Sequence, residues 1–269
     1  MKIITLLEND TGTSGVPGEH GLSLYVETGK HRLISDTGAS DLTWQNASAL
    51  GVDVSLTDTV IISHGHYDHA GGLMTLAALA PQAEIYMRRG ADGDFFNGDK
   101  YIGIDKRITS LRRLHLTEGN SEIGDGLFLF TVTDKKRPVP AGNGKLTELK
   151  NGAKSPDDFS HEQYLVITEN RRRTLISGCA HNGILNILDK YHELFGEYPY
   201  RVISGFHMMN RDGLTASDEA LIRETARELS SLPTLFYTGH CTGEPAYLIM
   251  NEIMCDNLFR IRSGDMIED

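Results

Sequence analysis

Cysteine is scarce in this chain of 269 residues: there are three, and two of them lie within histidine-containing motifs. A small, odd number of cysteines suits a reducing compartment better than a disulfide framework. The chain also lacks any apolar run near the roughly 20 residues of a membrane span. Its first acidic residue, Glu8, comes too early for the apolar region of a signal peptide. We therefore expect a cytoplasmic protein without membrane contact.

Positive charge is also in short supply, because 26 Lys and Arg stand against 37 Asp and Glu, for a net charge of −11. Neutralisation of phosphates by Lys and Arg dominates nonspecific nucleic-acid binding, so the composition argues against nucleic acid as a partner. The basic residues are unevenly distributed: residues 85–154 hold 13 of them against nine acidic residues, about +4. This stretch either steers a small anion or forms an ordinary solvated face, and the sequence leaves both readings open.

A second Asp-Thr-Gly motif is missing as well. Asp36-Thr37-Gly38-Ala39-Ser40 follows an apolar strand, as the catalytic motif of an aspartic protease does, but it occurs once. Those enzymes need two such carboxylates facing each other. The single copy in a chain too long for the small dimeric kind therefore excludes that class.

The densest group of potential metal ligands is His64-Gly65-His66-Tyr67-Asp68-His69, which directly follows the β-branched run of residues 59–63. Imidazole nitrogens and a carboxylate are ligands that a borderline cation such as Zn²⁺ binds. The end of a buried strand would hold them at a fixed angle. We therefore predict a metal site here rather than a polar surface turn.

The stretch from His64 to Gly72 resembles the His-x-His-x-Asp-His signature of the metallo-β-lactamase superfamily, and Asp36-Thr37-Gly38 resembles its short Asp-Thr-Gly turn. Further motifs resemble, in the same order, the subgroup typified by dihydropterin–ribofuranosylaminobenzene 5'-phosphate synthase. These are Gly178-Cys179-Ala180-His181, Gly205-Phe206-His207 and His240-Cys241-Thr242-Gly243. The resemblance spans nearly the whole chain.

Apolar periodicity predicts the main elements. We expect strands at residues 3–7, 22–27, 32–35, 60–63, 83–87, 164–168, 174–177, 200–204 and 234–238. We expect helices at residues 40–50, 73–79, 184–194 and 217–229, the last with Ser217 as its N-cap. Strands that alternate with helices in two similar halves favour an α/β fold with two mixed β-sheets packed face to face and flanked by helices.

The resemblance implies the same architecture, a four-layer αββα sandwich. We interpret residues 1–269 as a single domain of the metallo-β-lactamase type. A loop-rich, relatively basic insert at about residues 88–160 could cover the site. The sequence leaves the oligomeric state open.

The resemblance also implies two divalent metal ions, which we expect to be zinc, with manganese and iron as alternatives. By analogy, His64, His66 and His181 would hold one ion. Asp68, His69 and His240 would hold the other. His181 and His240 both follow predicted strands, where ligands to a site at one edge of a sandwich should lie.

One position departs from the family pattern. Many members carry an aspartate that bridges the two metals after the glycine of the corresponding strand, whereas this chain has Cys179. A thiolate could serve as a ligand, but we interpret Cys179 as a small packed residue beside the ligands. His161 is an alternative third ligand for the first metal. Asp36 is expected to accept a hydrogen bond from a ligand histidine.

His207 follows a strand but exceeds the six expected ligands, so we predict that it contacts substrate or delivers a proton. The alternative is a satisfied buried histidine. Asp68 would both ligate a metal and hold the proton of the nucleophile. Thr242, Arg88 and Arg89 are further expected substrate contacts, because a phosphate suits the guanidinium fork.

The remaining histidines are less informative. His20 could line the same edge of the sandwich as the predicted site. His31, His115 and His192 are interpreted as surface or loop residues.

Two cations about 3.5–4 Å apart would polarise a phosphoryl or carbonyl oxygen and lower the pKa of a bound water toward roughly 7. We therefore expect an enzyme that acts on a small anionic, phosphorylated or diphosphorylated metabolite. It would do so by metal-hydroxide hydrolysis, or, as the subgroup resemblance implies, by metal-assisted displacement of diphosphate from a pterin. The motifs do not separate these two reactions.

Two alternative functions remain: a hydrolase of an ester, thioester or lactone, and a non-catalytic metal-binding module. We do not expect a flavo-diiron reductase, which would need a glutamate at His66 and a flavin domain. We do not expect a β-lactamase either, because that class would need an export signal.

Overall fold

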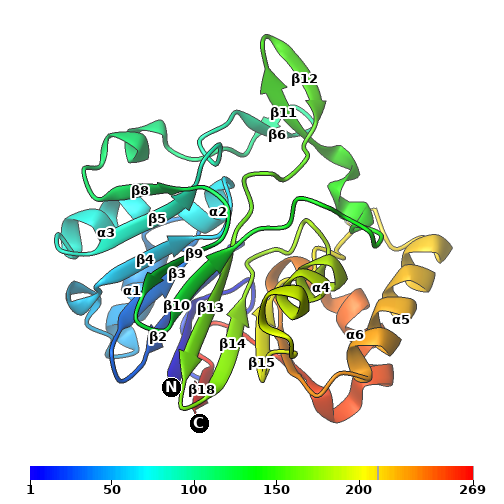
Figure 1. Cartoon of the computed structure of the whole chain (residues 1–269). Coiled ribbons are helices and arrows are strands. Elements are labelled where there is room, and N and C mark those ends of the chain that lie inside the picture. Colours follow the sequence, from blue (N-terminus) through cyan, green and yellow to red (C-terminus); the bar gives the residue numbers. More distant parts are fainter. Residues whose placement is uncertain (211, 269) are drawn as a thin grey trace.

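The computed structural model describes residues 1–210 and 212–268 as two β-sheets packed face to face, with helices on both outer faces (Figure 1). The first sheet is mixed, because β3, β4, β5 and β8 run parallel and the other strands antiparallel. Its spatial order is β18 (Met266–Glu268), β1 (Lys2–Leu7), β2 (Ser23–Glu27), β3 (Arg32–Ser35), β4 (Thr59–Ile62), β5 (Glu84–Arg88) and β8 (Leu114–Thr117).

The second sheet repeats this plan, with β14 to β17 parallel and the rest antiparallel. Its spatial order is β17 (Leu258–Arg260), β16 (Leu235–Thr238), β15 (Arg201–Ser204), β14 (Arg172–Ile176), β13 (Tyr164–Glu169), β10 (Leu127–Phe130) and β9 (Ser121–Gly124). The α/β sandwich predicted from the sequence is confirmed.

Three apolar layers hold the sandwich together. The central layer joins the inner faces of both sheets, for example Ile61 of β4 with Ile176 of β14. Outside the first sheet, α1 (Leu42–Ala49) and α3 (Leu73–Leu79) bury Trp44 and Leu76 against the strands. Outside the second sheet lie α4 (Ile184–Phe195), α5 (Ala216–Ser230) and α6 (Glu244–Met254). The middle of each sheet is therefore buried on both faces, which explains the consecutive apolar residues of a strand such as β4.

The stretch predicted as an insert at 88–160 is only partly separate from the sandwich. Strands β8, β9 and β10 complete the two main sheets, so these segments belong to the sandwich itself. The remainder forms a small antiparallel sheet that projects from the sandwich in Figure 1. Its order is β12 (Ala153–Pro156), β11 (Leu146–Lys150), β6 (Phe95–Asn97) and β7 (Lys100–Tyr101).

Short helical turns complete the fold. They are α2 (Tyr67–Ala70) and the 3₁₀ turns η1 (Val54–Leu56), η2 (Lys106–Ser110), η3 (Ala141–Lys145), η4 (His240–Thr242) and η5 (Cys255–Asn257). The predicted N-cap of α5 is wrong, because Thr215 caps this helix in place of Ser217. The Thr215 hydroxyl accepts from the Asp218 N–H at 3.2 Å, and the Asp218 carboxylate accepts from the Thr215 N–H at 2.8 Å. This reciprocal pair is a capping box, which Ser217, inside the helix, cannot form.

None of the helices in the described part of the chain is long and apolar enough to cross a lipid bilayer.

Candidate metal centre

The predicted ligands meet at one edge of the sandwich, where parallel strands of both sheets end. His64 follows β4 of the first sheet. His181, His207 and His240 follow β14, β15 and β16 of the second sheet. Because these three strands are adjacent and parallel, their carboxyl ends lie side by side. The sandwich then brings the two sets of histidines together.

Glycines allow the metal loop, residues 64–72, to pack this tightly. A Cβ atom on Gly65 would lie 2.1 Å from the Ala91 carbonyl oxygen, and one on Gly71 would lie 2.1 Å from that of Ala39. Neither position has room for a side chain. The loop is thus pressed against two neighbouring segments, and α2 begins directly at Tyr67 and carries Asp68 and His69 inward.

The first group of histidines is His64, His66 and His181. Their ring centroids lie 4.5 to 5.0 Å apart, and all three residues are buried. The Nε2 atoms of His64 and His181 are buried and have no hydrogen-bond partner among the described residues. The Cys179 Sγ lies within 4.8 Å of ring nitrogens of both His64 and His181. Buried polar atoms are nearly always satisfied, so these bare nitrogens require an explanation.

The second group is Asp68, His69 and His240. The Nε2 atoms of His69 and His240 face each other at 3.2 Å, and the Asp68 Oδ2 lies 3.4 Å from the His240 Nε2. The Nε2 of His20 lies 3.3 Å from the same carboxylate oxygen, so His20 lines this group too. Because two lone pairs repel, two imidazole nitrogens this close need a proton or a metal ion between or beside them.

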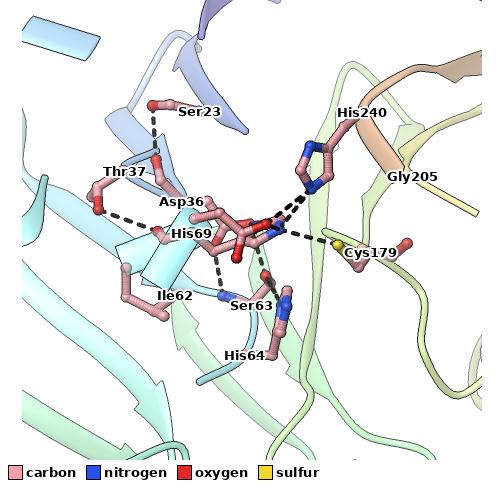
Figure 2. A network of polar contacts seen from close by, with 12 residues as sticks. Ser23, Asp36, Thr37, Ile62, Ser63, His64, His69, Cys179, Gly205 and His240 are labelled. Atoms are coloured by element: carbon pink, nitrogen blue, oxygen red, sulfur yellow. Dashed lines mark hydrogen bonds and ion pairs between the residues drawn. The ribbon is translucent and has the colours of Figure 1, made fainter. Parts of the chain in front are cut away.

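Asp36 orders the metal loop through a network of hydrogen bonds (Figure 2). Its Oδ1 accepts from the Ser63 N–H at 2.7 Å, and its Oδ2 accepts from the Ser63 hydroxyl at 2.7 Å. The same Oδ2 lies 2.7 Å from the His69 Nδ1, and the Ser63 hydroxyl lies 2.8 Å from the His64 Nδ1. A partner on Nδ1 leaves Nε2 of both histidines directed into the site.

At four of the six predicted ligands, the electrostatics favour the protonation state that metal binding requires. Burial, followed by the neighbouring imidazoles, lowers the pKa of His64 and His181, which keeps both rings neutral. Burial also lowers the pKa of His66. For Asp68, burial alone would raise the pKa, but the hydrogen bond from His240 and the charge on His69 outweigh it and hold the pKa well below its usual range.

His69 behaves differently from the other histidines. Burial alone would lower its pKa, but the Asp36 carboxylate outweighs burial and raises the pKa of His69 to about 9. A metal ion at its Nε2 must therefore displace a proton near neutral pH.

These residues fit divalent metal ions. They supply neutral imidazoles, an ionised carboxylate and a buried thiol, which are the ligand types of zinc and related ions. Every one of the six predicted ligands lies in one of the two groups. The observation that carries the fit is the set of buried nitrogens without a protein partner.

His161, the alternative ligand, has a different position. Its Nδ1 accepts from the Gly65 N–H at 3.1 Å, and its Nε2 lies 3.1 Å from the Asp157 Oδ2. Both ring nitrogens therefore have protein partners, whereas the Nε2 of His181 has none within residues 1–210 and 212–268. This contrast favours His181 as the ligand and gives His161 the task of holding the metal loop.

Cys179 lies between the two groups rather than behind them. Its Sγ is 3.1 Å from the His69 Nε2 and lies within 4.8 Å of ligand atoms of both groups. We expected a packed residue beside the ligands. The 2% exposure agrees with this prediction, and burial raises the pKa of the thiol well above its usual value. The position between the two groups is also the one that a bridging thiolate would occupy.

His207 lies beside the first group, with its ring centroid 4.1 Å from that of His181. Its Nδ1 is buried without a partner among the described residues, and its backbone N–H donates to the Cys241 Sγ at 3.3 Å. Thr242 is 1% exposed. Its hydroxyl accepts from the Phe206 N–H at 2.9 Å and lies 2.6 Å from the Thr238 hydroxyl. Thr242 therefore braces the turn that carries His207.

Arg88 and Arg89 are not brought into the histidine cluster by the contacts they make. Arg88 donates to the backbone carbonyls of Thr117 and Ser160, each at 3.4 Å, and Arg89 forms an exposed ion pair with Glu118. Much of the positive charge of residues 85–154 is likewise paired with nearby carboxylates. Away from the site lie His31, His115 and His192. His31 contacts Asp58, and His115 contacts Glu84.

Sequence reasoning missed several buried residues that shape the site. Asp157 contacts His161 at 3.1 Å and lies 3.9 Å from the His66 Nε2. Burial alone would raise the pKa of Asp157, but the contact with His161 and the nearby His66 ring outweigh burial and lower it. Phe159 stacks on the His181 ring with centroids 4.4 Å apart. Glu162 accepts from the backbone N–H of His181 at 2.8 Å. The sequence offers one signal for these residues: Glu162 is an acidic residue just before the apolar strand β13.

Comparisons with known proteins agree with this geometry. The sequence pattern of the metallo-beta-lactamase superfamily matches residues 16–233. A 7,8-dihydropterin-6-methyl-4-(beta-D-ribofuranosyl)-aminobenzene-5'-phosphate synthase from Methanocaldococcus jannaschii is 26% identical over 100% of this chain and 96% of its own length.

Two solved structures support the same fold. Tm1679, described as a metal-dependent hydrolase of the beta-lactamase superfamily, is 31% identical with a TM-score of 0.85, covering 100% of this chain and 99% of its own. The Zn²⁺-bound PqqB of Methylobacterium extorquens shares the fold alone, at 14% identity and a TM-score of 0.57 over the full length of both chains. Motifs, sandwich and ligand cluster thus lead to one assignment: the chain belongs to the metallo-β-lactamase superfamily.

Proposed function

We propose that this protein is an enzyme that uses two divalent metal ions, expected to be zinc, to act on a small phosphorylated or diphosphorylated metabolite. The reaction is either hydrolysis or displacement of diphosphate. His64, His66 and His181 would hold one ion, and Asp68, His69 and His240 the other. We add Cys179 as a shared ligand. When bound, such a pair of ions neutralises developing negative charge on phosphoryl oxygens and activates water.

One observation carries this proposal: buried nitrogens of His64, His181 and His207 lie within one cluster and have no hydrogen-bond partner in the described part of the chain. The first two belong to the ligand set. The third, His207 Nδ1, is available to a further polar group, which we take to be an anionic oxygen of the substrate.

The residues of the chain then have distinct tasks. Asp36 and Ser63 orient His64 and His69, and Asp68 can receive the proton of the attacking group at Oδ2, where His20 is 3.3 Å away. His207, as a donor, would bind a phosphoryl oxygen or protonate the leaving group. The relative from Methanocaldococcus jannaschii is named as a synthase that forms a phosphate-bearing product, which supports a phosphate-bearing substrate here.

Metal analysis followed by a substrate screen tests the proposal. We expect two equivalents of metal per chain, and turnover of a compound drawn from phosphomonoesters, phosphodiesters and pterin diphosphates. Release of inorganic phosphate alone would assign hydrolysis, whereas release of diphosphate with a new covalent product would assign transfer. Activity only on neutral esters, thioesters or lactones would overturn the phosphate assignment.

Replacing His207 with alanine should lower kcat/KM for the best substrate by about 10- to 100-fold, the size expected when a hydrogen bond to a charged group is lost. Both metal equivalents should remain, because His207 lies outside the ligand set. Steady-state kinetics with parallel metal analysis measures this. The double variant Arg88→Ala and Arg89→Ala is the comparison. It should weaken substrate binding mainly at low salt, because it removes long-range attraction of the anionic substrate. Unchanged kinetics in His207→Ala would remove His207 from the proposal.

Replacing Cys179 with serine should weaken metal binding by about 10-fold or more, because the loss of a residue that only orients a ligand already lowers metal affinity by that factor. The cobalt-substituted protein should lose the absorption band of a cobalt–thiolate bond, a readout independent of activity. Cys255→Ser is the matched control, since that thiol is exposed. An unchanged band and unchanged affinity in Cys179→Ser would return Cys179 to the role of a packed residue.

A further inference from the structure

Two histidines that follow separate strands of the second sheet, His181 after β14 and His240 after β16, are held by the same arrangement of side chains. Asn143 of η3 donates from Nδ2 to the His181 carbonyl oxygen at 2.8 Å, and its Oδ1 lies 3.0 Å from the His181 Nδ1. Asn9, which follows β1, donates from Nδ2 to the His240 carbonyl oxygen at 3.2 Å, and its Oδ1 lies 2.9 Å from the His240 Nδ1. Each asparagine thus grips one histidine at two points.

A buried glutamate completes each arrangement. Glu162 accepts from the backbone N–H of His181, and Glu8 accepts from the backbone N–H of His240. Both glutamates are at most 2% exposed. The backbone N–H, the carbonyl and the ring Nδ1 of each histidine are therefore all occupied by one glutamate and one asparagine.

The two contacts of each asparagine determine its orientation. A carbonyl oxygen only accepts hydrogen bonds, so the atom facing it must be the amide NH₂. The amide oxygen then faces Nδ1 and can only accept. In addition, the Asn9 Oδ1 accepts from the Gly21 N–H at 3.3 Å, which agrees with this orientation.

An acceptor opposite Nδ1 places the ring proton on that nitrogen and leaves the lone pair on Nε2. This is the tautomer that a metal ligand needs when it binds through Nε2. The Nε2 of His181 is one of the buried nitrogens of the first group that have no hydrogen-bond partner among the described residues. The Nε2 of His240 faces His69 and Asp68 in the second group. Each asparagine therefore acts on a different group.

We infer that Asn143 and Asn9 are positioning residues, each of which sets the ring tautomer and orientation of one metal-binding histidine and thereby the affinity of one metal site. The inference rests on the proposed function, because it assumes that both groups bind metal. Neither asparagine lies in a histidine motif. Asn143 comes from the stretch 88–160, so this segment contributes to the first site.

Stepwise zinc affinities, measured by competition with a chelator, test the inference. Asn143→Leu should weaken one binding step by about 10- to 100-fold and leave the other within about twofold, and Asn9→Leu should do the reverse. Asn143→Asp and Asn9→Asp keep the acceptor and should restore most of the affinity. Asn97→Leu, an exposed position on β6, is the control and should change neither step.

A second readout is independent of affinity. Nitrogen-15 NMR of the histidine rings reports which nitrogen carries the proton, and it should show His181 and His240 protonated at Nδ1 in the wild-type protein. Asn143→Leu should disturb the His181 signal alone, and Asn9→Leu the His240 signal alone. If a leucine variant does not fold, the aspartate variant and the wild-type tautomers still decide the matter.

The outcomes separate this inference from the proposed function. If the wild-type protein binds fewer than two metal ions, the dinuclear function fails, while the tautomers still test the orientation by asparagine. If it binds two ions but both leucine variants keep both affinities, or if His181 and His240 carry the proton on Nε2, the positioning role is overturned and the proposed function stands.

Discussion

Alanine at His64 or at His69 is expected to remove bound metal and catalytic activity together. The two residues belong to different groups, but His69 lies beside Cys179 and His240, and the His64 and His69 rings are only 4.2 Å apart. Loss of a residue that merely orients a ligand already costs about 10- to 100-fold in affinity, so loss of a ligand should exceed about 100-fold. Metal content after dialysis and turnover of the best substrate measure the effect.

His192→Ala provides the control, since this histidine is exposed on α4, away from the cluster. It should retain both metals and full turnover. Normal metal occupancy with normal turnover in His64→Ala or His69→Ala would contradict the assignment of the ligands.

Metal affinity is expected to rise by at least about tenfold per pH unit between pH 7 and pH 9. One cause is His69, since the Asp36 carboxylate outweighs burial and raises its pKa to about 9 in the metal-free protein. At pH 7 a metal ion must displace this proton. The Cys179 thiol adds to the rise if it is a ligand, because burial raises its pKa well above the usual value. The pKa values of His64, His66 and His181 are lowered, so these rings offer no competing proton.

The stability of the metal-free protein should change in the opposite sense. A pKa raised in the folded state means that protonated His69 stabilises the fold fully below about pH 6.5, and that this contribution is lost as the pH rises through 9. Chelator competition across pH, together with denaturant unfolding of the metal-free protein, measures both trends.

Asp36→Asn is the informative variant for this prediction. It removes the charge that raises the pKa of His69, so the rise in metal affinity should move toward lower pH. A metal affinity that stays flat between pH 7 and 9 in the wild-type protein would show that His69 carries no proton to displace.

The motifs made much of the site predictable because metal ligands concentrate at strand ends. A β-branched run followed directly by His64 to His69 marks such an end, and the same reasoning led to His181 and His240. The architecture was predictable for a similar reason: a strand buried on both faces has an apolar centre, as in β4, where Val60, Ile61 and Ile62 follow one another.

The partners of the ligands could not be predicted in this way. Asn9 is 231 positions from His240, and Asn143 is 38 positions from His181, within a turn that carries no periodic pattern. Their roles exist only once the sheets are packed. The small sheet escaped prediction because its strands are short, and β7 and β12 are exposed throughout, so no alternation of burial marks these two. By contrast, the sequence does contain a signal for α6 that our prediction did not use: Pro245 lies in its first turn, where proline is favoured at the start of a helix.

Each group of ligands draws on both sheets: His64 and His69 follow β4 of the first, and His181 and His240 follow strands of the second. A metal ion in either group would therefore link the two sheets, because its ligands come from both of them. Its binding free energy would then add to the cohesion of the entire fold, by about 4 kcal/mol when free metal exceeds the dissociation constant 1,000-fold. The resistance of the protein to heat and proteases would then depend on how much metal its surroundings supply.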